Sequence, residues 1–395
     1  MNILIVSQYY YPEQFQINEI AEGLVKKGHS VTVLCGLPNY PQGRIFKGYR
    51  FGKRHETVNG VEIKRCFQFG RGKSKVGLIL NYVSFALSGS LKVLFLKKKY
   101  DVAVSYQLSP VTMAYPAMLY KKLSGKKLFL YCLDIFPESV LSHTGRDGFI
   151  YRKTAGISRK IYSACNLIGV TSKPFLKYLN EVNGVDKEKM VYLPQHAGDE
   201  MLKMDLGAED NGVADFMFAG NIGFGQNLET LVEAASLIAD RDFVVHIVGD
   251  GSKLNSLKDA VREKGLEKRF VFYGRVDRSE MPDYYKKADA LILTLRGDNA
   301  VGDTMPGKLQ TYMTTGKPII GAINGAAQEV ILESGCGLCG PASDAGTLAR
   351  NMLAFIDSPE SFIGCGEKAR EYFLEYFTRD KCINDWERIL TECAE

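Results

Sequence analysis

The chain of 395 residues has few of the side chains that build metal and redox centres. It contains five histidines and nine cysteines, and only Cys336 and Cys339 are closely spaced. A structural zinc site needs four such ligands, usually arranged in two pairs, so we expect no metal site and no redox role. The odd number of scattered cysteines favours reduced thiols in a cytosol.

The signatures of several other protein classes are also missing. The N-terminal segment MNILIV leads directly into a buried-strand pattern, without the basic start and cleavage site of a signal peptide. No zinc finger, RNA-recognition signature or basic zipper is present, so we expect no nucleic acid as a partner. The first predicted strand is followed by Ser7, Gln8 and Tyr9. A dinucleotide-dependent oxidoreductase would have a Gly-x-Gly-x-x-Gly turn there, and that class is therefore a weaker alternative.

Positive charge is concentrated in the first half of the chain. Residues 1–200 carry 29 Lys and Arg against 14 Asp and Glu, whereas residues 201–395 carry 21 against 31, although the whole chain has a net charge of only +5. A basic half of this size predicts an anionic surface as a partner. Since nothing indicates nucleic acid, we expect an anionic membrane.

Short apolar runs alternate with amphipathic helical patterns along the whole chain, which is typical of parallel α/β sheets. In the first half the predicted strands are 3–7, 31–34, 102–105, 128–132, 167–170 and 191–193. In the second half they are 215–219, 244–248, 270–273, 290–293 and 318–322. A polar stretch at 198–214 is predicted to be the linker. The pattern predicts two Rossmann-like doubly wound domains facing a cleft, the first over residues 1–200 and the second over 201–377.

One segment of the first half, residues 76–96, is largely apolar with a single charge, Lys92, and has lysines on both flanks. Its length approaches that of a membrane span, but interspersed polar residues weaken that hypothesis. A helix lying on a membrane surface fits better, and a buried helix of the first domain stays open as the alternative.

Four turns rich in small residues follow predicted strands of the second half. They are Gly220–Gln226, Gly249–Gly251, Gly274–Arg275 and Asp303–Lys308. The fourth turn has an acid, Asp303, before Pro306 and Gly307, which start a predicted helix that Gly316 ends. Amides at a helix N-terminus bind phosphate, and an acid can contact sugar hydroxyls, so this turn predicts a site for a phosphorylated sugar. Each turn taken alone could be an ordinary β-loop-α connection, but four at the ends of strands in one domain favour a nucleotide site.

The motifs at these turns resemble the donor domain of family 4 glycosyltransferases. They are Ala219-Gly-Asn-Ile-Gly223, Val248-Gly-Asp-Gly251, Tyr273-Gly-Arg-Val276, Pro306-Gly-Lys308 and Thr315-Gly-Lys-Pro318. In the first half, Leu37-Pro-Asn-Tyr-Pro-Gln-Gly43 and Asp134-Ile-Phe-Pro-Glu-Ser139 resemble the branch that builds bacterial capsule and O-antigen sugars. The resemblance covers nearly the whole chain and implies the GT-B fold, in which a last helix, here about 378–395, packs back on the first domain.

The resemblance also implies roles for individual residues. The amides around Gly307, Lys308 and Leu309 would hold the nucleotide diphosphate, with Lys308 as the favoured cation, and Gly223 would approach the distal phosphate. The Gly274–Arg275 turn would contact the base, and Asp303 the transferred sugar. Asp134, in the acceptor domain, would orient the acceptor hydroxyl or act as a base. The other implied donor contacts are Gly220, Asn221, Gln226, Gly249, Asp250, Met305, Pro306 and Thr311.

Four of these positions depart from the family's pattern, and the first is Asp303, which stands where the family has a Glu. Thr311 stands where a second Glu usually grips the ribose. Asn221 and Gln226 stand where an Arg and a Lys usually offset the charge of the leaving phosphates. The resemblance still implies a retaining, metal-independent enzyme that needs no cofactor.

Such an enzyme would move a sugar from a nucleotide-sugar donor, with uridine diphosphate (UDP) as the expected nucleotide, to a lipid-linked saccharide. Its expected location is cytoplasmic, peripheral on the inner face of the cell membrane. A nucleotide-sugar epimerase of the same architecture is the nearest alternative, and a non-enzymatic membrane scaffold is a further one.

Overall fold

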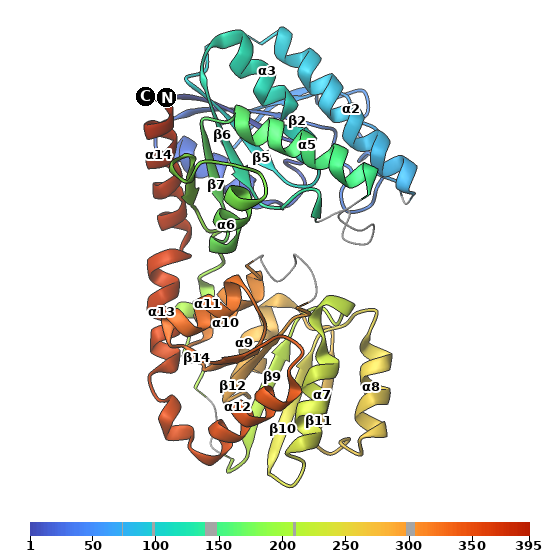
Figure 1. Cartoon of the computed structure of the whole chain (residues 1–395), viewed down its shortest axis with the longest axis vertical. Coiled ribbons are helices and arrows are strands. Elements are labelled where there is room, and N and C mark those ends of the chain that lie inside the picture. Colours follow the sequence, from blue (N-terminus) through green and yellow to red (C-terminus); the bar gives the residue numbers. More distant parts are fainter. Residues whose placement is uncertain (73, 97–98, 139–147, 208–210, 298–304) are drawn as a thin grey trace. The chain divides into compact units, whose positions relative to one another are not determined.

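The computed structural model describes residues 1–72, 74–96, 99–138, 148–207, 211–297 and 305–395. It forms two compact units (Figure 1). Unit 1 comprises Met1–Gln195 and Asp380–Glu395, and unit 2 comprises His196–Arg379. The division falls shortly before the predicted boundary at residue 200.

The predicted linker at 198–214 is wrong in part. Residues Glu200–Lys203 form a short 3-10 helix, η3, and Leu206 lies in the core of unit 2 with Met201 and Leu202 packed against that core. The stretch is mostly polar, and its three apolar residues are too close together to show a helical or strand period. The sequence therefore did not predict this packing.

An eight-stranded sheet forms the centre of unit 1, with the strand order β3-β4-β2-β1-β5-β6-β7-β8. Only β3 and β4 pair antiparallel. The order reverses between β1 and β5, and the loops that follow these two strands therefore diverge. The strands are β1 (Asn2–Ser7), β2 (Ser30–Cys35), β3 (His55–Val58), β4 (Val61–Arg65), β5 (Val102–Gln107), β6 (Lys127–Cys132), β7 (Leu167–Val170) and β8 (Met190–Tyr192).

Both faces of this sheet are covered, because alternate side chains of its buried strands point to opposite sides. Leu4 and Val6 join a core formed with α2 (Lys75–Leu94), α3 (Tyr115–Ser124), α5 (Phe149–Ala164) and α6 (Lys173–Glu181). Ile3 and Ile5 join a second core, formed with α1 (Gln16–Lys26) and α14 (Arg379–Ala394).

Helix α14 completes unit 1 although it follows unit 2 in the sequence. Its Trp386 is fully buried, with ring centroids 5.4 Å from Phe129 and 4.9 Å from Tyr131 in edge-on contacts. Both partners lie on β6, near the middle of the sheet. The second core of unit 1 therefore depends on two chain segments far apart in sequence.

Unit 2 contains a six-stranded parallel sheet in the order β11-β10-β9-β12-β13-β14. Numbered within the unit, this is the order 3-2-1-4-5-6 of a Rossmann domain, whose ligands bind where the order reverses, here between β9 and β12. The strands are β9 (Ala214–Ala219), β10 (Phe243–Val248), β11 (Phe270–Gly274), β12 (Ala290–Thr294), β13 (Ile319–Ala322) and β14 (Gly337–Gly340).

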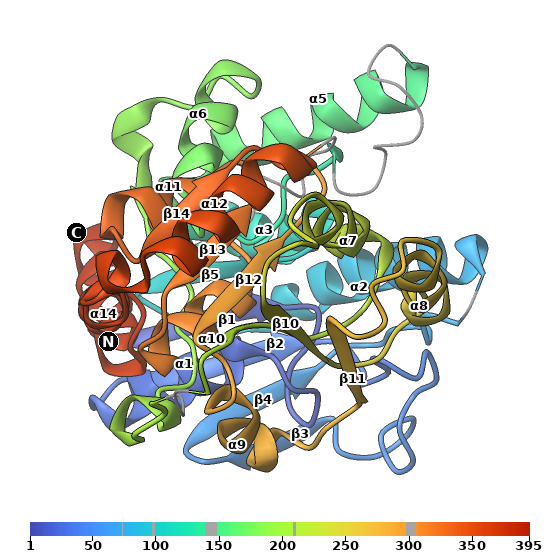
Figure 2. The same ribbon diagram turned by 90° about the horizontal axis from the view of Figure 1, so that it is seen from below.

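Helices cover both faces of the second sheet as well, and Figure 2 shows α8 and α9 on opposite sides of β10 and β11. One core includes residues of α7 (Leu228–Leu237), α8 (Leu254–Glu263) and α12 (Ala345–Asp357). The other includes residues of α9 (Met281–Tyr285), α10 (Gly307–Thr315), α11 (Ala326–Ser334) and α13 (Cys365–Tyr376).

Candidate functional site

Three of the four predicted turns of unit 2 are joined to one another by backbone hydrogen bonds. The amide of Gly220, after β9, donates to the carbonyl of Val248 at 2.9 Å, and the amide of Ile222 donates to the carbonyl of Asp250, also at 2.9 Å. The amide of Gly249, after β10, donates to the carbonyl of Gly274 at 2.8 Å. The turns after β9, β10 and β11 therefore form one continuous edge.

Two glycines are required by this close packing. Gly249 has φ +139°, and a Cβ there would lie 1.9 Å from the carbonyl oxygen of Gly220. A Cβ on Gly251 would lie 2.2 Å from the carbonyl oxygen of Ile222. Since both obstacles are backbone atoms, a side chain at either position would force the turns apart.

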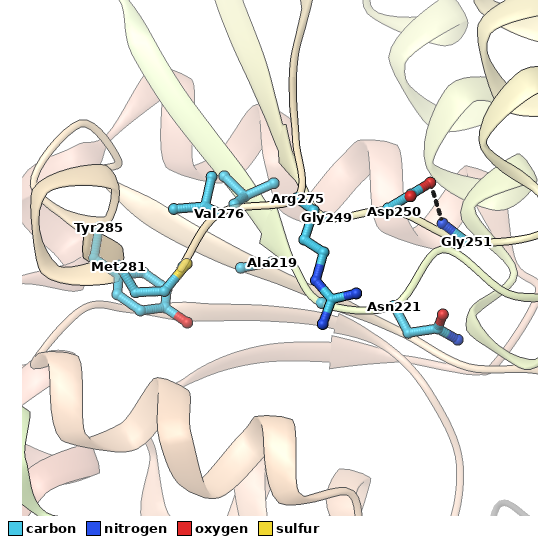
Figure 3. Close-up of a pocket in the computed structure, with 11 residues that line it drawn as sticks. Ala219, Asn221, Gly249, Asp250, Gly251, Arg275, Val276, Met281 and Tyr285 are labelled. Atoms are coloured by element: carbon cyan, nitrogen blue, oxygen red, sulfur yellow. Dashed lines mark hydrogen bonds between the residues drawn. The ribbon is translucent and has the colours of Figure 1, made fainter. Parts of the chain in front are cut away.

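A pocket of about 590 Å³ opens along this edge. Figure 3 shows the Arg275 side chain extending toward Asn221, with Met281 and Tyr285 on one side and the Asp250–Gly251 turn on the other. The Asp250 carboxylate accepts a hydrogen bond from the Gly251 amide at 2.7 Å. Five of the predicted contacts line the pocket, namely Gly220, Asn221, Gly249, Asp250 and Arg275.

The pocket also has a wall that the sequence did not indicate. Met281 and Tyr285 come from α9, a helix of only five residues. A segment this short gives no helical period, so nothing in the sequence marks these two side chains as a site. They add an apolar side to a pocket whose other members are mostly turn residues.

The fourth turn leads into α10. Pro306 is the residue just before this helix, and Gly316, in the left-handed conformation, ends it. Lys308, in the first turn of α10, donates from Nζ to Oε1 of Gln226 at 2.6 Å. The same Nζ lies 3.5 Å from the centroid of the Phe218 ring on β9. Burial holds the pKa of Lys308 well below its usual range. Lys308 thus joins the start of α10 to the turn after β9, across the point where the strand order reverses.

The other residues near α10 that were predicted to contact the donor differ from Lys308 in their hydrogen bonds and burial. The Thr311 hydroxyl donates to the carbonyl of Gly307 at 3.1 Å, within the helix itself. The amide of Leu309 donates to the carbonyl of Pro306, and its side chain is fully buried. Gly307 and Lys308 therefore supply the leading amides of the helix. Met305 packs against the core of unit 2, and Asp303 lies outside the described residues.

Gly223 and Gln226 form the rim of the turn after β9. The Gln226 amide donates to the carbonyl of Gly223 at 3.0 Å. Beside them the guanidinium of Arg296 lies 4.0 Å from the centroid of the Phe224 ring, and its amide donates to the carbonyl of Gly225. Arg296 is therefore held against this turn by stacking and by its backbone, and it adds positive charge near Gln226.

In unit 1, Asp134 follows β6 in a partly buried position. Its backbone carbonyl accepts a hydrogen bond from Nε2 of Gln107 on β5 at 3.0 Å. Burial raises the pKa of the Asp134 carboxyl, although hydrogen bonds from Ser109 lower it. A carboxylate with a raised pKa is a stronger base than an exposed one, which suits the role implied by the resemblance.

A second carboxyl of unit 1, Glu13, was not indicated by the sequence. It is 3% exposed, and its Oε1 accepts hydrogen bonds from the amides of Asn39 and Tyr40, both at 2.7 Å. Its Oε2 accepts from the amide of Tyr10 at 3.3 Å. Glu13 therefore ties the loop after β1 to the loop after β2, and no local pattern in the sequence could have revealed this long-range role.

Glu13 provides a test based on pH. Burial raises its pKa from 4.5 to about 7, against the three backbone hydrogen bonds, which lower it. Because the folded pKa is above the unfolded one, ionisation opposes folding, and stability should fall as pH rises from about 4.5 to about 7. The shift corresponds to about 3 kcal/mol. Glu13→Gln keeps an acceptor for Asn39 and Tyr40, and should remove most of this slope in urea denaturation between pH 4.5 and 8.

The matched control for this test is Glu188→Gln, an exposed glutamate of the same unit. That variant should retain the slope of the parent protein. A Glu13→Gln protein whose stability varies with pH as steeply as the parent's would contradict the assignment of the slope to Glu13.

No group of three or more His, Cys, Asp and Glu side chains that could hold a metal ion occurs within the ranges that the structure describes. In the closely spaced pair, Cys336 lies just before β14 and Cys339 lies on it, both as free thiols. Burial raises the pKa of both thiols, to about 11 and about 12 respectively.

Comparison with known proteins finds a family model that matches the part of the chain containing these turns. Residues 206–372 match the model of the family described as glycosyl transferases group 1, and this range contains all the turns described above. Most of unit 2 is therefore similar to the group 1 glycosyltransferases.

Two curated relatives are similar to this chain over most of its length. The putative colanic acid biosynthesis glycosyl transferase WcaI of Escherichia coli K12 is 25% identical over 338 residues, which is 80% of this chain and 82% of the relative. The probable glycosyltransferase WbjE of Pseudomonas aeruginosa is 25% identical over 350 residues, 84% of this chain and 86% of the relative.

Solved structures establish the fold of the chain. The crystal structure of Anabaena HepE in complex with UDP has a TM-score of 0.72 at 12% identity, covering 99% of this chain and 100% of that one. A glycosyltransferase from Rickettsia africae has a TM-score of 0.70 at 16% identity, covering 100% and 98%. The predicted GT-B fold, with two Rossmann-like domains built on parallel sheets, is confirmed.

Proposed function

We propose that this chain is a glycosyltransferase that transfers a sugar from a UDP-linked donor to a lipid-linked saccharide, with retention and without a metal ion, in the synthesis of a bacterial surface polysaccharide. The observation that carries the proposal is the pocket after β9, β10 and β11, with Lys308 beside it. The names of WcaI and WbjE support glycosyl transfer, and that of WcaI supports polysaccharide synthesis. The complex of HepE with UDP supports the choice of nucleotide.

The chemical problem is the charge on the departing nucleoside diphosphate. As the glycosidic bond breaks, negative charge grows on the leaving phosphate while the sugar becomes oxocarbenium-like. In the proposal, the first amides of α10 and the positive end of its dipole face this charge. The ammonium of Lys308 adds a full charge in a partly buried position, where its interaction with phosphate is strong.

Each end of the pocket suits a different part of the donor. The apolar side formed by Met281 and Tyr285 would receive the base, close to the backbone of Gly274 and Arg275. The turn from Gly220 to Gln226 would approach the diphosphate, as Lys308 bonds to Gln226. Thr311 remains the proposed partner of the ribose, since its hydroxyl can accept a hydrogen bond while donating to Gly307.

Asp134 and Asp303 take the remaining roles in the proposal. Asp303 would contact the hydroxyls of the transferred sugar. The raised pKa of Asp134 lets it accept the acceptor hydroxyl's proton, or orient that hydroxyl while the leaving phosphate takes the proton on the same face. The family match favours this reading over the epimerase, which would turn over its donor with no acceptor present.

Thermal unfolding in EDTA is the direct test. Saturating UDP, at about 100 times its Kd, should stabilise unit 2 by about 2.7 kcal/mol and raise its melting temperature by about 5 °C or more. ADP and GDP at the same concentration serve as controls and should give smaller shifts. A shift that appears only when a divalent metal is added would overturn the metal-independent mechanism, and equal shifts with all three nucleotides would overturn the choice of UDP.

A further inference from the structure

The most exposed apolar surface of unit 1 lies on α2. Seven apolar side chains of this helix are each 48% exposed or more, and they recur at spacings of three and four residues, which place them on one side of the helix. Phe95, the residue after the helix, is 83% exposed and extends the row. We call this set the α2 ridge, and it consists of Val76, Ile79, Leu80, Val83, Leu87, Leu91, Leu94 and Phe95.

Two phenylalanines widen the ridge on one flank. Phe67 and Phe69 are 45% and 49% exposed and contact each other edge-on at 4.9 Å. Their segment is fixed along α2, because Ser88 donates to the carbonyl of Phe67 and the amide of Phe69 donates to Ser84 at 3.0 Å. These aromatic side chains are therefore held in place beside the ridge.

The other flank is a groove of about 870 Å³ between α2 and α3. Val83 and Leu87 line it from α2, and Tyr115, Met118 and Leu119 line it from α3. Lys121, Lys122 and Lys160 also line it, and none of its lining residues is acidic. The groove thus combines an apolar floor with a cationic edge.

The opposite side of α2 is bound to unit 1. Phe85 and Val93 lie in the core beneath it, and Asn81 is fully buried. The Asn81 side chain accepts a hydrogen bond from Gln8 at 2.8 Å and donates to the carbonyl of Phe69 at 2.5 Å. Although α2 is long and apolar enough to cross a bilayer, a helix with one side packed in this way presents only its ridge to lipid.

The positive charge around the α2 ridge indicates which kind of partner binds there. Between residues 71 and 133 the sequence has eleven Lys and Arg and a single acid, Asp101, and α5 adds four basic residues and no acid. A second copy of the same face would bring these like charges together, which opposes self-association. A bilayer containing anionic lipid satisfies both the apolar ridge and the surrounding cations.

We propose that the α2 ridge, with Phe67, Phe69 and the neighbouring groove, docks unit 1 on an anionic lipid bilayer, with α2 lying in the interface rather than crossing it. At about 1.5 Å per residue the ridge is about 30 Å long, which suits a broad surface better than a small ligand. Lys75 and Lys92, near its two ends, and the lysines beside the groove contact lipid phosphates. This docking does not require sugar transfer, so it can be tested apart from the proposed function.

The test measures binding of the full chain to vesicles without any sugar donor. Sedimentation with phosphatidylcholine vesicles that contain about 30% phosphatidylglycerol should show binding that 0.5 M salt weakens, and pure phosphatidylcholine should bind less. The triple variant Leu80→Gln, Leu87→Gln and Leu91→Gln should need at least about tenfold more lipid for half-maximal binding. Since all three side chains are exposed, its melting temperature should stay near that of the parent.

A matched control places the same change on unit 2. Leu237, Leu332 and Leu374 are 63%, 58% and 54% exposed, and their triple glutamine variant should bind vesicles like the parent. The proposal is overturned if the α2 variant binds as well as the parent, or if both triple variants lose binding equally. It is also overturned if the parent binds no vesicles but forms a dimer in sedimentation velocity that the α2 variant abolishes.

Discussion

Replacing Lys308 with methionine is expected to reduce the rate of sugar transfer by about 100- to 1,000-fold. Methionine keeps an unbranched apolar stem against Phe218 but removes the ammonium that would meet the leaving diphosphate. The bond from Nζ to Gln226 is also lost. Because burial already disfavours the Lys308 ammonium in the free protein, unit 2 should remain folded without it. Steady-state kinetics with a UDP-sugar and a lipid-linked acceptor would measure the loss.

The low pKa of Lys308 adds a signature that a structural residue would not give. Burial disfavours the ammonium in the free protein, and the negative diphosphate favours it in the complex. Donor binding should therefore take up a proton, and donor affinity should fall as pH rises. Calorimetric titration of UDP in two buffers of different ionisation enthalpy would detect the proton, and Lys308→Met should abolish the difference between the buffers.

The control for both measurements is Lys317→Met. Lys317 is also buried, with its pKa lowered by burial to about 8, but it lies beyond the opposite end of α10. That variant should keep the parent's transfer rate and proton uptake. Parental rates in Lys308→Met, or equal losses in both variants, would remove Lys308 from the proposed site.

Gly249→Ala should abolish most of the donor binding, with a loss of at least about tenfold in UDP affinity. The new methyl group would meet the carbonyl oxygen of Gly220 at 1.9 Å, and φ +139° is a conformation that residues with a side chain rarely adopt. The chain can relieve both problems only by breaking the hydrogen bond from Gly249 to Gly274 and separating the turns. Calorimetry would measure the loss of UDP affinity, and the melting temperature of unit 2 would show how far the separated turns destabilise it.

The control variant Gly265→Ala separates the effect of backbone strain from that of the clash between turns. Gly265 also has a positive φ, +65°, but no atom lies within 4 Å of its would-be Cβ, and it is outside the pocket. This variant should lose a little stability and no UDP affinity. If Gly249→Ala binds UDP as tightly as Gly265→Ala does, the packed turns are not the donor site.

The sequence predicted the parallel sheets and the glycine turns because both follow from local patterns. Buried strands are short apolar runs, and the turns at Gly220 and Gly249 carry glycine where their backbones approach one another. Helix α10 was also predicted with both its ends, since Pro306 and Gly316 are local signals. The GT-B fold came from the resemblance of these motifs to a family.

Features that depend on contacts between distant residues could not be predicted. Glu13 has its role only because the loops after β1 and β2 meet, and Met281 and Tyr285 line the pocket only because α9 lies beside it. The hydrogen bond from Lys308 to Gln226 joins residues 82 positions apart. The sequence left the segment at 76–96 between a surface helix and a buried one. The structure shows one side of this helix exposed and the other buried, so the helix is not wholly buried and its contact with a membrane stays a prediction.

The return of α14 to unit 1 has a consequence for biosynthesis. Unit 2 is a single continuous stretch and can form as soon as residues 196–379 have left the ribosome, whereas Trp386 and Leu390 must be made before the second core of unit 1 can close. The domain that is translated first is thus the last to be completed. During that interval the nascent chain carries the bare sheet face around Phe129 and Tyr131, a surface on which chaperones can act.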